Sequence, residues 1–78
     1  MKYLKTDNTR QFLNRTGVQI AEPTEISTEY VTVVAMTIGN IFTVPICSSD
    51  AELAKLKALK TEKRWYQIAK NELPTINN

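Results

Sequence analysis

YVTVVAMTIGNIFTVPI, which spans residues 30–46, is rich in β-branched and other apolar residues and is interrupted near its middle by Gly39-Asn40. Residues of this kind favour extended backbone, while Gly and Asn tolerate the positive φ of a tight turn. The stretch therefore predicts a β-hairpin that turns at Gly39-Asn40. In this register Thr37 lies opposite Phe42, Ala35 opposite Val44, and Val33 opposite Ile46.

The two faces of this hairpin differ in composition, because alternate residues of a strand point to opposite sides. One face collects Val31, Val33, Ala35, Phe42, Val44 and Ile46, which we expect to form the core. The other face carries Tyr30, Thr32, Val34, Met36, Ile38, Ile41, Thr43 and Pro45. This second face is only half polar, which is unusual for a sheet face in water.

Pro45 limits how the hairpin can pair, since proline has no N–H to give to a neighbouring strand. With a two-residue turn, Pro45 would stand opposite Val34 at a hydrogen-bonded position of the ladder. Either the loop is longer, spanning residues 38–41, or the second strand ends at Val44. Both alternatives place the end of this strand near a sheet edge.

The chain changes character at Ser48-Ser49, after which residues 50–73 contain no Gly or Pro and many helix-forming residues. Ser49 and Glu52 have the spacing of a capping box, which predicts that a helix begins there. Leu53, Leu56 and Leu59 form one apolar stripe, and Trp65, Ile68 and Ala69 form another, turned around the cylinder. We therefore expect a helical segment over 49–73, as one helix or, as the stripes favour, two helices with a break near Lys60-Thr61.

The region before the hairpin predicts two further elements. Residues 9–15 suit a short helix capped by Asp7 or Asn8, with Gly17 as a left-handed stop. Residues 18–21 alternate as a half-buried strand does. Residues 1–5 could add an edge strand, and residues 74–78 read as a frayed tail. The chain is thus expected to be one α+β domain over 1–78, with a small antiparallel sheet of three to four strands, a short N-terminal helix and a C-terminal helical segment.

Size and composition indicate how such a domain could be stabilised. With 78 residues, the core supplies only roughly 3–5 kcal/mol of net stability. Cys47 is the single cysteine and the sequence has no histidine, so neither an internal disulfide nor a zinc site is expected, and no other metal or cofactor is indicated. Self-association remains as a reinforcement, with a dimer favoured. Neither a signal peptide nor a membrane segment is evident, so we expect a cytoplasmic protein without membrane contact.

Catalysis is not expected from this sequence. A nucleophile needs a base and an orienting group, and no histidine is available for that purpose. Cys47 is explained as a buried apolar residue, and Ser49 as a helix cap. The acidic cluster of Glu22, Glu25 and Glu29 fits a solvated loop that keeps a sheet edge charged. No pattern indicates a small-molecule substrate.

The half-polar face of the hairpin instead suggests contact with another protein. Its apolar residues exceed what a monomer normally leaves in water, unless the C-terminal segment covers them. We expect a non-catalytic protein-interaction module that self-associates and binds an unidentified protein partner through an apolar sheet face or a sheet edge. A chain of this size suits an accessory protein, such as a phage-encoded inhibitor or assembly factor. The expected contact residues are Tyr30, Val34, Met36, Ile38 and Ile41.

Nucleic-acid binding is the alternative function. The segment Lys60–Gln67 mixes cations with aromatic residues, and cations neutralise phosphates while aromatic rings stack on bases. Arg10 and Arg15 would extend such a surface if the first helix lay alongside it. The net charge of only +2 weakens this alternative. The residues that would make the contact are Lys60, Lys63, Arg64, Tyr66 and Lys70.

Overall fold

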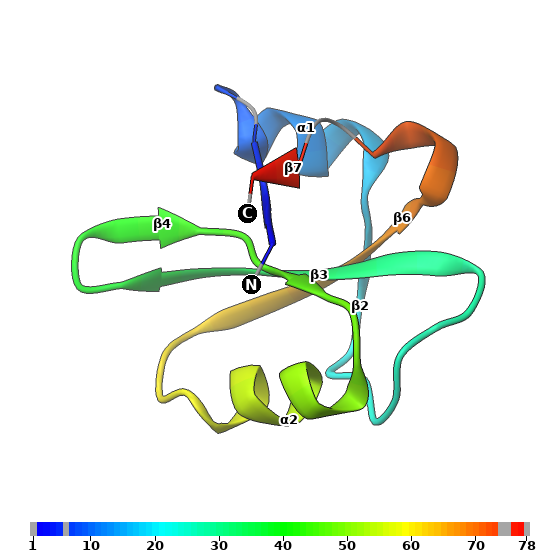
Figure 1. Cartoon of the computed structure of the whole chain (residues 1–78). Coiled ribbons are helices and arrows are strands. Elements are labelled where there is room, and N and C mark those ends of the chain that lie inside the picture. The colour runs from blue at the N-terminus through cyan, green and yellow to red at the C-terminus, as the bar shows by residue number, and fades with distance from the viewer. Residues whose placement is uncertain (1, 6, 74–75, 78) are drawn as a thin grey trace.

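The computed structural model describes residues 2–5, 7–73 and 76–77, and it confirms the α+β class with an antiparallel sheet (Figure 1). In chain order the elements are β1 (Tyr3–Leu4), α1 (Thr9–Thr16), β2 (Val18–Ile20), β3 (Tyr30–Ile38), β4 (Ile41–Thr43), β5 (Ile46–Cys47), α2 (Asp50–Ala58), β6 (Lys63–Ala69), the 3-10 helix η1 (Lys70–Glu72) and β7 (Ile76–Asn77). No helix in this described part is long and apolar enough to cross a membrane.

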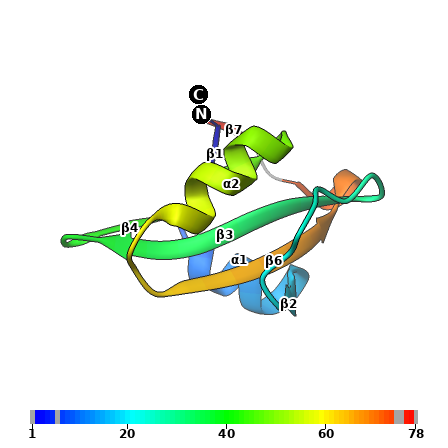
Figure 2. The ribbon, with the colours of Figure 1, turned by 90° about the horizontal axis from the view of Figure 1, so that it is seen from below.

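The main sheet has five strands in the order β2-β6-β3-β4, with β5 also paired to β3. The longest strand, β3, pairs with β6 over seven positions, from Tyr30 opposite Ala69 to Met36 opposite Lys63. β1 and β7 form a separate two-stranded pair. α1 lies on one side of the main sheet and α2 on the other, as Figures 1 and 2 show. We call these two sides of the sheet the α1 face and the α2 face.

The hairpin forms in the predicted register. Thr37 pairs with Phe42 and Val33 with Ile46, and the turn is the two-residue Gly39-Asn40. Gly39 has φ +62° and no other described residue has a positive φ, which is typical of a type II′ turn. β4 ends at Thr43, so the strand stops just before Pro45, as the second of the two alternatives required.

β1 lies along the bend that Pro45 produces. The Leu4 N–H donates to the Val44 carbonyl at 3.0 Å, and the Ile46 N–H donates to the Lys2 carbonyl at 2.7 Å. A bridge between Tyr3 and Pro45 completes this contact. The edge of the sheet is therefore covered from Val44 onward.

The helical segment predicted over 49–73 is correct for α2 and for the short η1 at Lys70–Glu72, but wrong for Lys63–Ala69. The capping box is present, because the Glu52 N–H donates to Ser49 Oγ at 3.2 Å and the Glu52 carboxylate accepts from the Ser48 N–H. The chain also breaks near Lys60-Thr61, as expected. Lys63–Ala69, however, forms β6 and not a second helix. Trp65 and Ile68, which were predicted from the sequence to share one helical stripe with Ala69, are buried on opposite faces of this strand.

Each face of the sheet has its own core. On the α1 face, the residues predicted for the core pack with Leu4, Leu13, Tyr66 and Ile68. On the α2 face, Val34, Met36, Cys47 and Trp65 pack under Leu53 and Leu56 of α2. Figure 2 shows α2 lying across β3 on this side. The expected uncovered apolar face is therefore wrong for this part of β3, because α2 covers it.

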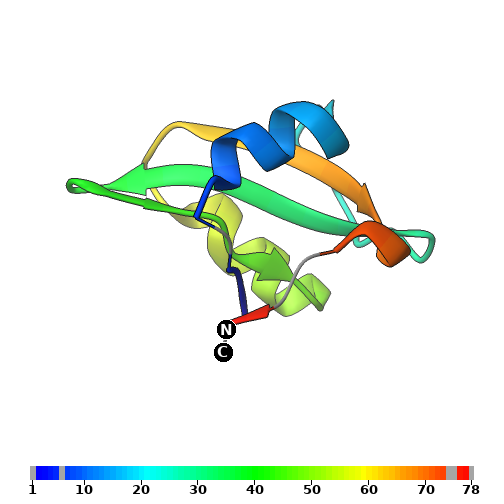
Figure 3. The same cartoon turned by 90° about the horizontal axis from the view of Figure 1, so that it is seen from above.

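The short helix and the strand predicted before the hairpin are both present, but the predicted role of Gly17 is wrong. α1 covers Thr9–Thr16 and lies over the sheet in Figure 3, and β2 covers Val18–Ile20. Gly17 is not a left-handed stop, since its φ is −82°. Glycine is needed there for space, because a Cβ atom would meet the Leu13 carbonyl oxygen at 3.0 Å and Tyr66 Cδ2 at 3.3 Å. Of the expected frayed tail, residues 74, 75 and 78 lie outside the described residues, whereas Ile76–Asn77 form β7.

Candidate functional site

The predicted protein-contact residues do not form one surface. Val34 is 0% exposed and Met36 is 4% exposed, so both belong to the core under α2 and cannot meet a partner in this fold. Tyr30, Ile38 and Ile41 are exposed by 43%, 48% and 69%. Tyr30 stands at the opposite end of β3 from the other two. Only Ile38 and Ile41, which are direct partners across the hairpin, stay together as an apolar surface.

These two isoleucines lie beside a free sheet edge. Within residues 2–5, 7–73 and 76–77, no strand pairs with the outer side of Ile41–Thr43. In Figure 1 the β3–β4 hairpin reaches out beyond both helices. Because Ile38 and Ile41 form the hydrogen-bonded pair next to the turn, the N–H and carbonyl of Phe42 point away from β3. We call this outer backbone side of Ile41–Thr43, together with the side chains of Ile38 and Ile41, the β4 edge.

The hairpin that carries the β4 edge has no charged residue of its own. Residues 30–49 contain no Asp, Glu, Lys or Arg. Exposed edge strands commonly carry a charged residue, a proline or a bulge that keeps other chains from pairing with them. Here Pro45 and β1 block the edge only from Val44 onward. Ile41–Thr43 has none of these protections.

The hairpin is held in place by the loop that precedes β6. The Thr61 hydroxyl donates to the Thr37 carbonyl at 2.6 Å. The Lys63 ammonium folds back on the same loop, where it donates to the carbonyls of Leu59 and Thr61. These contacts fix the base of the exposed hairpin end relative to α2 and β6.

The predicted nucleic-acid residues are dispersed because they lie on a strand and not on a helix. Alternation along β6 sends Lys63 to the α2 face and Arg64 to the α1 face. The ring of Tyr66 is buried, and the ammonium of Lys70 donates to the Thr28 carbonyl at 2.9 Å. Lys60 is exposed in the loop after α2. The structure therefore does not bring these five residues together on one surface.

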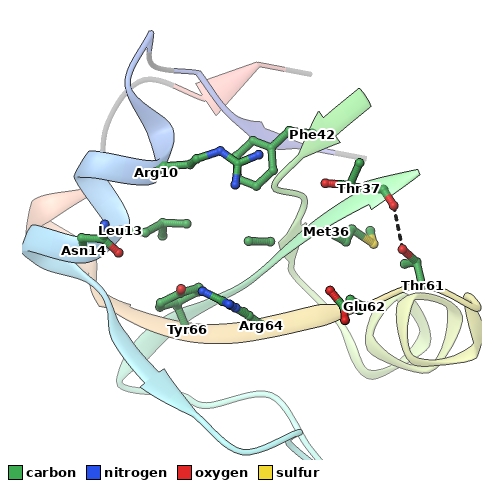
Figure 4. Close-up of a pocket in the computed structure, with 11 residues that line it drawn as sticks. Arg10, Leu13, Asn14, Met36, Thr37, Phe42, Thr61, Glu62, Arg64 and Tyr66 are labelled. Atoms are coloured by element: carbon green, nitrogen blue, oxygen red, sulfur yellow. Dashed lines mark hydrogen bonds between the residues drawn. The ribbon is translucent and has the colours of Figure 1, made fainter. Parts of the chain in front are cut away.

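Arg64 instead lines a groove on the α1 face that the sequence did not predict as a site. The groove has a volume of about 370 Å³ and lies between α1, the outer ends of β3 and β6, and Phe42 of β4 (Figure 4). One observation from the sequence pointed toward this groove. Arg10 was expected to extend the basic surface of Lys60–Gln67 if the first helix lay next to that segment. The polar and charged residues that line the groove are Arg10, Asn14, Thr37, Thr61, Glu62 and Arg64.

Two arginines enter this groove from different elements. Arg10 comes from α1, and its guanidinium carbon lies 3.8 Å from the centre of the Phe42 ring. Arg64 comes from β6 and lies beside Tyr66 in Figure 4. Neither guanidinium has an ion pair or a hydrogen bond to any residue that the structure describes. Glu62 supplies one carboxylate at the end of the groove near Thr61.

Cys47 has the environment of a core residue. It is buried on the α2 face, and this burial, with a smaller contribution from the Glu52 carboxylate, raises the pKa of its thiol from 9.0 to about 11. A thiol that stays protonated at neutral pH is a poor nucleophile. No group of three or more potential metal ligands occurs in the part of the chain that the structure describes.

Two surfaces thus stand out, the β4 edge and the groove between Arg10 and Arg64. The edge offers unpaired backbone groups beside exposed isoleucines, and the groove offers two guanidinium groups, one of which lies over the Phe42 ring. Comparison of the chain with protein-family models, with curated proteins and with solved structures finds no match.

Proposed function

We propose that this chain is a non-catalytic protein-binding module that pairs with a second copy of itself through the β4 edge. The observation that carries the proposal is the free outer side of Ile41–Thr43, next to two isoleucines that are exposed by 48% and 69%. Strand addition uses such an edge, because the main-chain groups supply hydrogen bonds and the neighbouring side chains supply apolar area.

The lack of charge favours a second copy as the occupant. Two identical edges meet around a two-fold axis, so any charged residue on the edge would lie close to the same charge of the second copy. Residues 30–49 carry no charge, so no side chain of the hairpin itself opposes self-pairing. Arg10 of α1, which stacks on the Phe42 ring, is a charged group beside the edge. In an antiparallel arrangement centred on Phe42, its outward N–H and carbonyl would exchange two hydrogen bonds with those of the second copy.

The short edge implies a weak dimer. Only three residues are free to pair before Pro45 and β1 close the edge. Interfaces of this kind fall at the small end of the range seen for protein complexes. We therefore expect dissociation constants between about 10 µM and about 1 mM.

Sedimentation equilibrium or light scattering across that concentration range tests the proposal. The mass should rise from 8.9 kDa toward twice that value as the concentration increases. Ile41→Lys should hold the mass at that of one chain, since it places like charges across the two-fold axis. Val18→Lys is the matched control, because Val18 is 64% exposed on the opposite edge strand, and it should still dimerise.

Two results would contradict self-pairing through this edge. One is a wild-type mass that stays at a single chain up to the highest concentration. The other is an Ile41→Lys protein that dimerises as well as the wild type does. Circular dichroism of each variant shows whether the fold is retained, which we expect because Ile41 and Val18 are both exposed.

A further inference from the structure

The groove on the α1 face presents two guanidinium groups that have no ion pair or hydrogen bond to the described residues, although that of Arg10 stacks on the Phe42 ring. Arg10 and Arg64 are both exposed to water, and both line one open groove of about 370 Å³. In Figure 4 they enter it from opposite sides, Arg10 from α1 and Arg64 from β6. A guanidinium presents several N–H donors in a fixed plane that matches the two oxygens of a carboxylate or the oxygens of a phosphate.

We propose that this groove binds a small organic anion, whose carboxylate or phosphate group lies between Arg10 and Arg64. The Asn14 amide is a further polar group at this position, on the same side of α1 as Arg10. The Thr61 hydroxyl donates to the Thr37 carbonyl and therefore has no proton left for a ligand. The guanidinium groups are the charged donors among the residues that line the groove.

The rest of the lining sets the character of the ligand. Leu13, Ala35, Phe42 and Tyr66 give the groove an apolar wall and floor, which suits a ring or a short hydrocarbon body. A cavity of this volume lies near the lower limit for small-molecule sites, so the body is about the size of one ring.

Glu62 limits the charge that the ligand can carry. Its carboxylate lines the same groove, so the two arginines and Glu62 together leave an excess of one positive charge. A polyanion such as a nucleic-acid strand would place further negative charges next to Glu62, and like charges at such distances repel. A single carboxylate matches this charge balance best, whereas a phosphate monoester, with a charge of about −1.5 to −2 at neutral pH, exceeds it.

Binding of three compounds with the same ring tests the proposal. Benzoate carries a carboxylate, phenyl phosphate carries a phosphate ester, and benzamide has a similar shape without charge. Titration followed by two-dimensional NMR at constant ionic strength should show saturable shifts of the Asn14, Thr37 and Arg64 amides with at least one of the two anions. Whichever anion binds more tightly identifies the source of the oxyanion.

Variants then assign the binding to the two arginines. Arg64→Gln and Arg10→Gln should each weaken binding about tenfold, because each removes a charged donor. Arg64→Lys keeps the charge but loses the planar donors, so it should weaken binding by a smaller factor. Lys55→Gln is the matched control, since it removes the same charge from an exposed position on α2, across the sheet from the groove, and should leave binding unchanged.

Three outcomes would overturn the proposal. They are the absence of saturable shifts with either anion, binding of benzamide as tight as that of the anions, and a Lys55→Gln protein whose binding is weakened as much as that of Arg64→Gln. Ile41→Lys should bind the anions normally, because Ile41 does not line the groove. The result is therefore independent of whether the chain dimerises through the β4 edge.

Discussion

Thr32 places a hydroxyl group in the core on the α2 face. It lies opposite Cys47 and Gln67 in the sheet, and its Oγ1 is buried with no hydrogen-bond partner in the part of the chain that the structure describes. Burying an unpaired hydroxyl costs about 1–3 kcal/mol. A methyl group of similar size would avoid this cost, and valine favours strands as threonine does.

We therefore expect Thr32→Val to raise the free energy of unfolding by about 1 kcal/mol. Urea denaturation followed by Trp65 fluorescence measures the change. Thr43→Val is a comparison within the same hairpin, because Thr43 is only half-buried, and it should change stability by much less. A Thr32→Val protein that is less stable than the wild type would show that the hydroxyl has a stabilising role.

Cys47 makes stability depend on pH above neutrality. Burial raises the pKa of the thiol to about 11 in the folded protein, whereas the unfolded chain ionises at about 9.0. As the pH rises, the unfolded state therefore loses this proton before the folded state does. The contribution of the buried thiol to stability is complete below pH 9 and is lost as the pH rises to 11. The loss should be about 2 kcal/mol in all.

Lysines and tyrosines titrate in the same range, so the contribution of Cys47 is a difference between two proteins. Between pH 8.5 and pH 11 the wild type should lose about 2 kcal/mol more stability than Cys47→Ala does. Urea titrations of both proteins across this range measure it. Parallel pH curves for the two proteins would mean that the thiolate is accommodated in the fold.

Single residues also show which signals the sequence carries. Gly39 was assignable to the turn, because a hairpin this tight needs positive φ next to strands of clear β character. The need for glycine at Gly17 was not visible, since the space there is limited by Tyr66, which lies far along the chain. A local backbone requirement can be read from neighbouring residues, whereas a close approach between distant segments cannot.

At the scale of elements, α2 is the helix that separates the core on the α2 face from water. Its nine residues cover the α2 face, mainly through Leu53 and Leu56. Truncating a buried leucine to alanine costs about 2–5 kcal/mol, which is comparable to the roughly 3–5 kcal/mol that a domain of this size has. We therefore expect Leu56→Ala to be largely unfolded at 37 °C.

Thermal denaturation followed by circular dichroism, with binding of a hydrophobic dye, checks this expectation. The dye should bind to Leu56→Ala, because Val34 and Met36 lose their cover. Lys55→Ala, one position earlier and exposed, should melt within a few degrees of the wild type. A Leu56→Ala protein that melts like the wild type would mean that α2 is dispensable for covering this face.

β6 shows why one element could not be read from the sequence. A strand with sheet neighbours on both sides and a covered face above and below does not alternate apolar with polar residues. Trp65, Ile68 and Ala69 are spaced by three and one, which also fits a helix, and Lys63-Arg64 and Lys70 have high helix propensity. The pairing with β2 and β3 overrides these local preferences. The hairpin over 30–46 was predictable because its turn and its β-branched residues agree.

At the scale of the whole molecule, the error over β6 also produced the error over the contact surface. If residues 60–73 were helical, β3 would lack its neighbour and the chain would have more apolar strand surface than it could cover. Because β6 pairs with β3 along one edge, the short helix α2 is long enough to cover the α2 face of the sheet. What remains of the predicted surface is Ile38 and Ile41. They flank the turn of the β3–β4 hairpin, and this hairpin extends beyond α2 in Figure 2.

Association through the β4 edge should be visible in the stability of the whole domain. A dimer that forms only from folded chains stabilises them by mass action. The melting temperature of the wild type should therefore rise with protein concentration between about 10 µM and about 1 mM. Differential scanning calorimetry at several concentrations measures this, and Ile41→Lys should melt at one temperature throughout. A wild-type melting temperature that does not change with concentration would contradict pairing in the folded state.

The position of β6 between β2 and β3 has a consequence for biosynthesis. β2 and β3 follow one another in the chain but do not touch in the sheet, because β6 separates them. A ribosome delivers Lys63–Ala69 only after both of its neighbours have emerged, so an unfinished chain that stops before Lys63 has no strand to join them. The hairpin of a nascent chain therefore lacks its central sheet neighbour until residues 63–69 emerge. We expect that a separate peptide with residues 63–69 can pair with a chain that ends at residue 62.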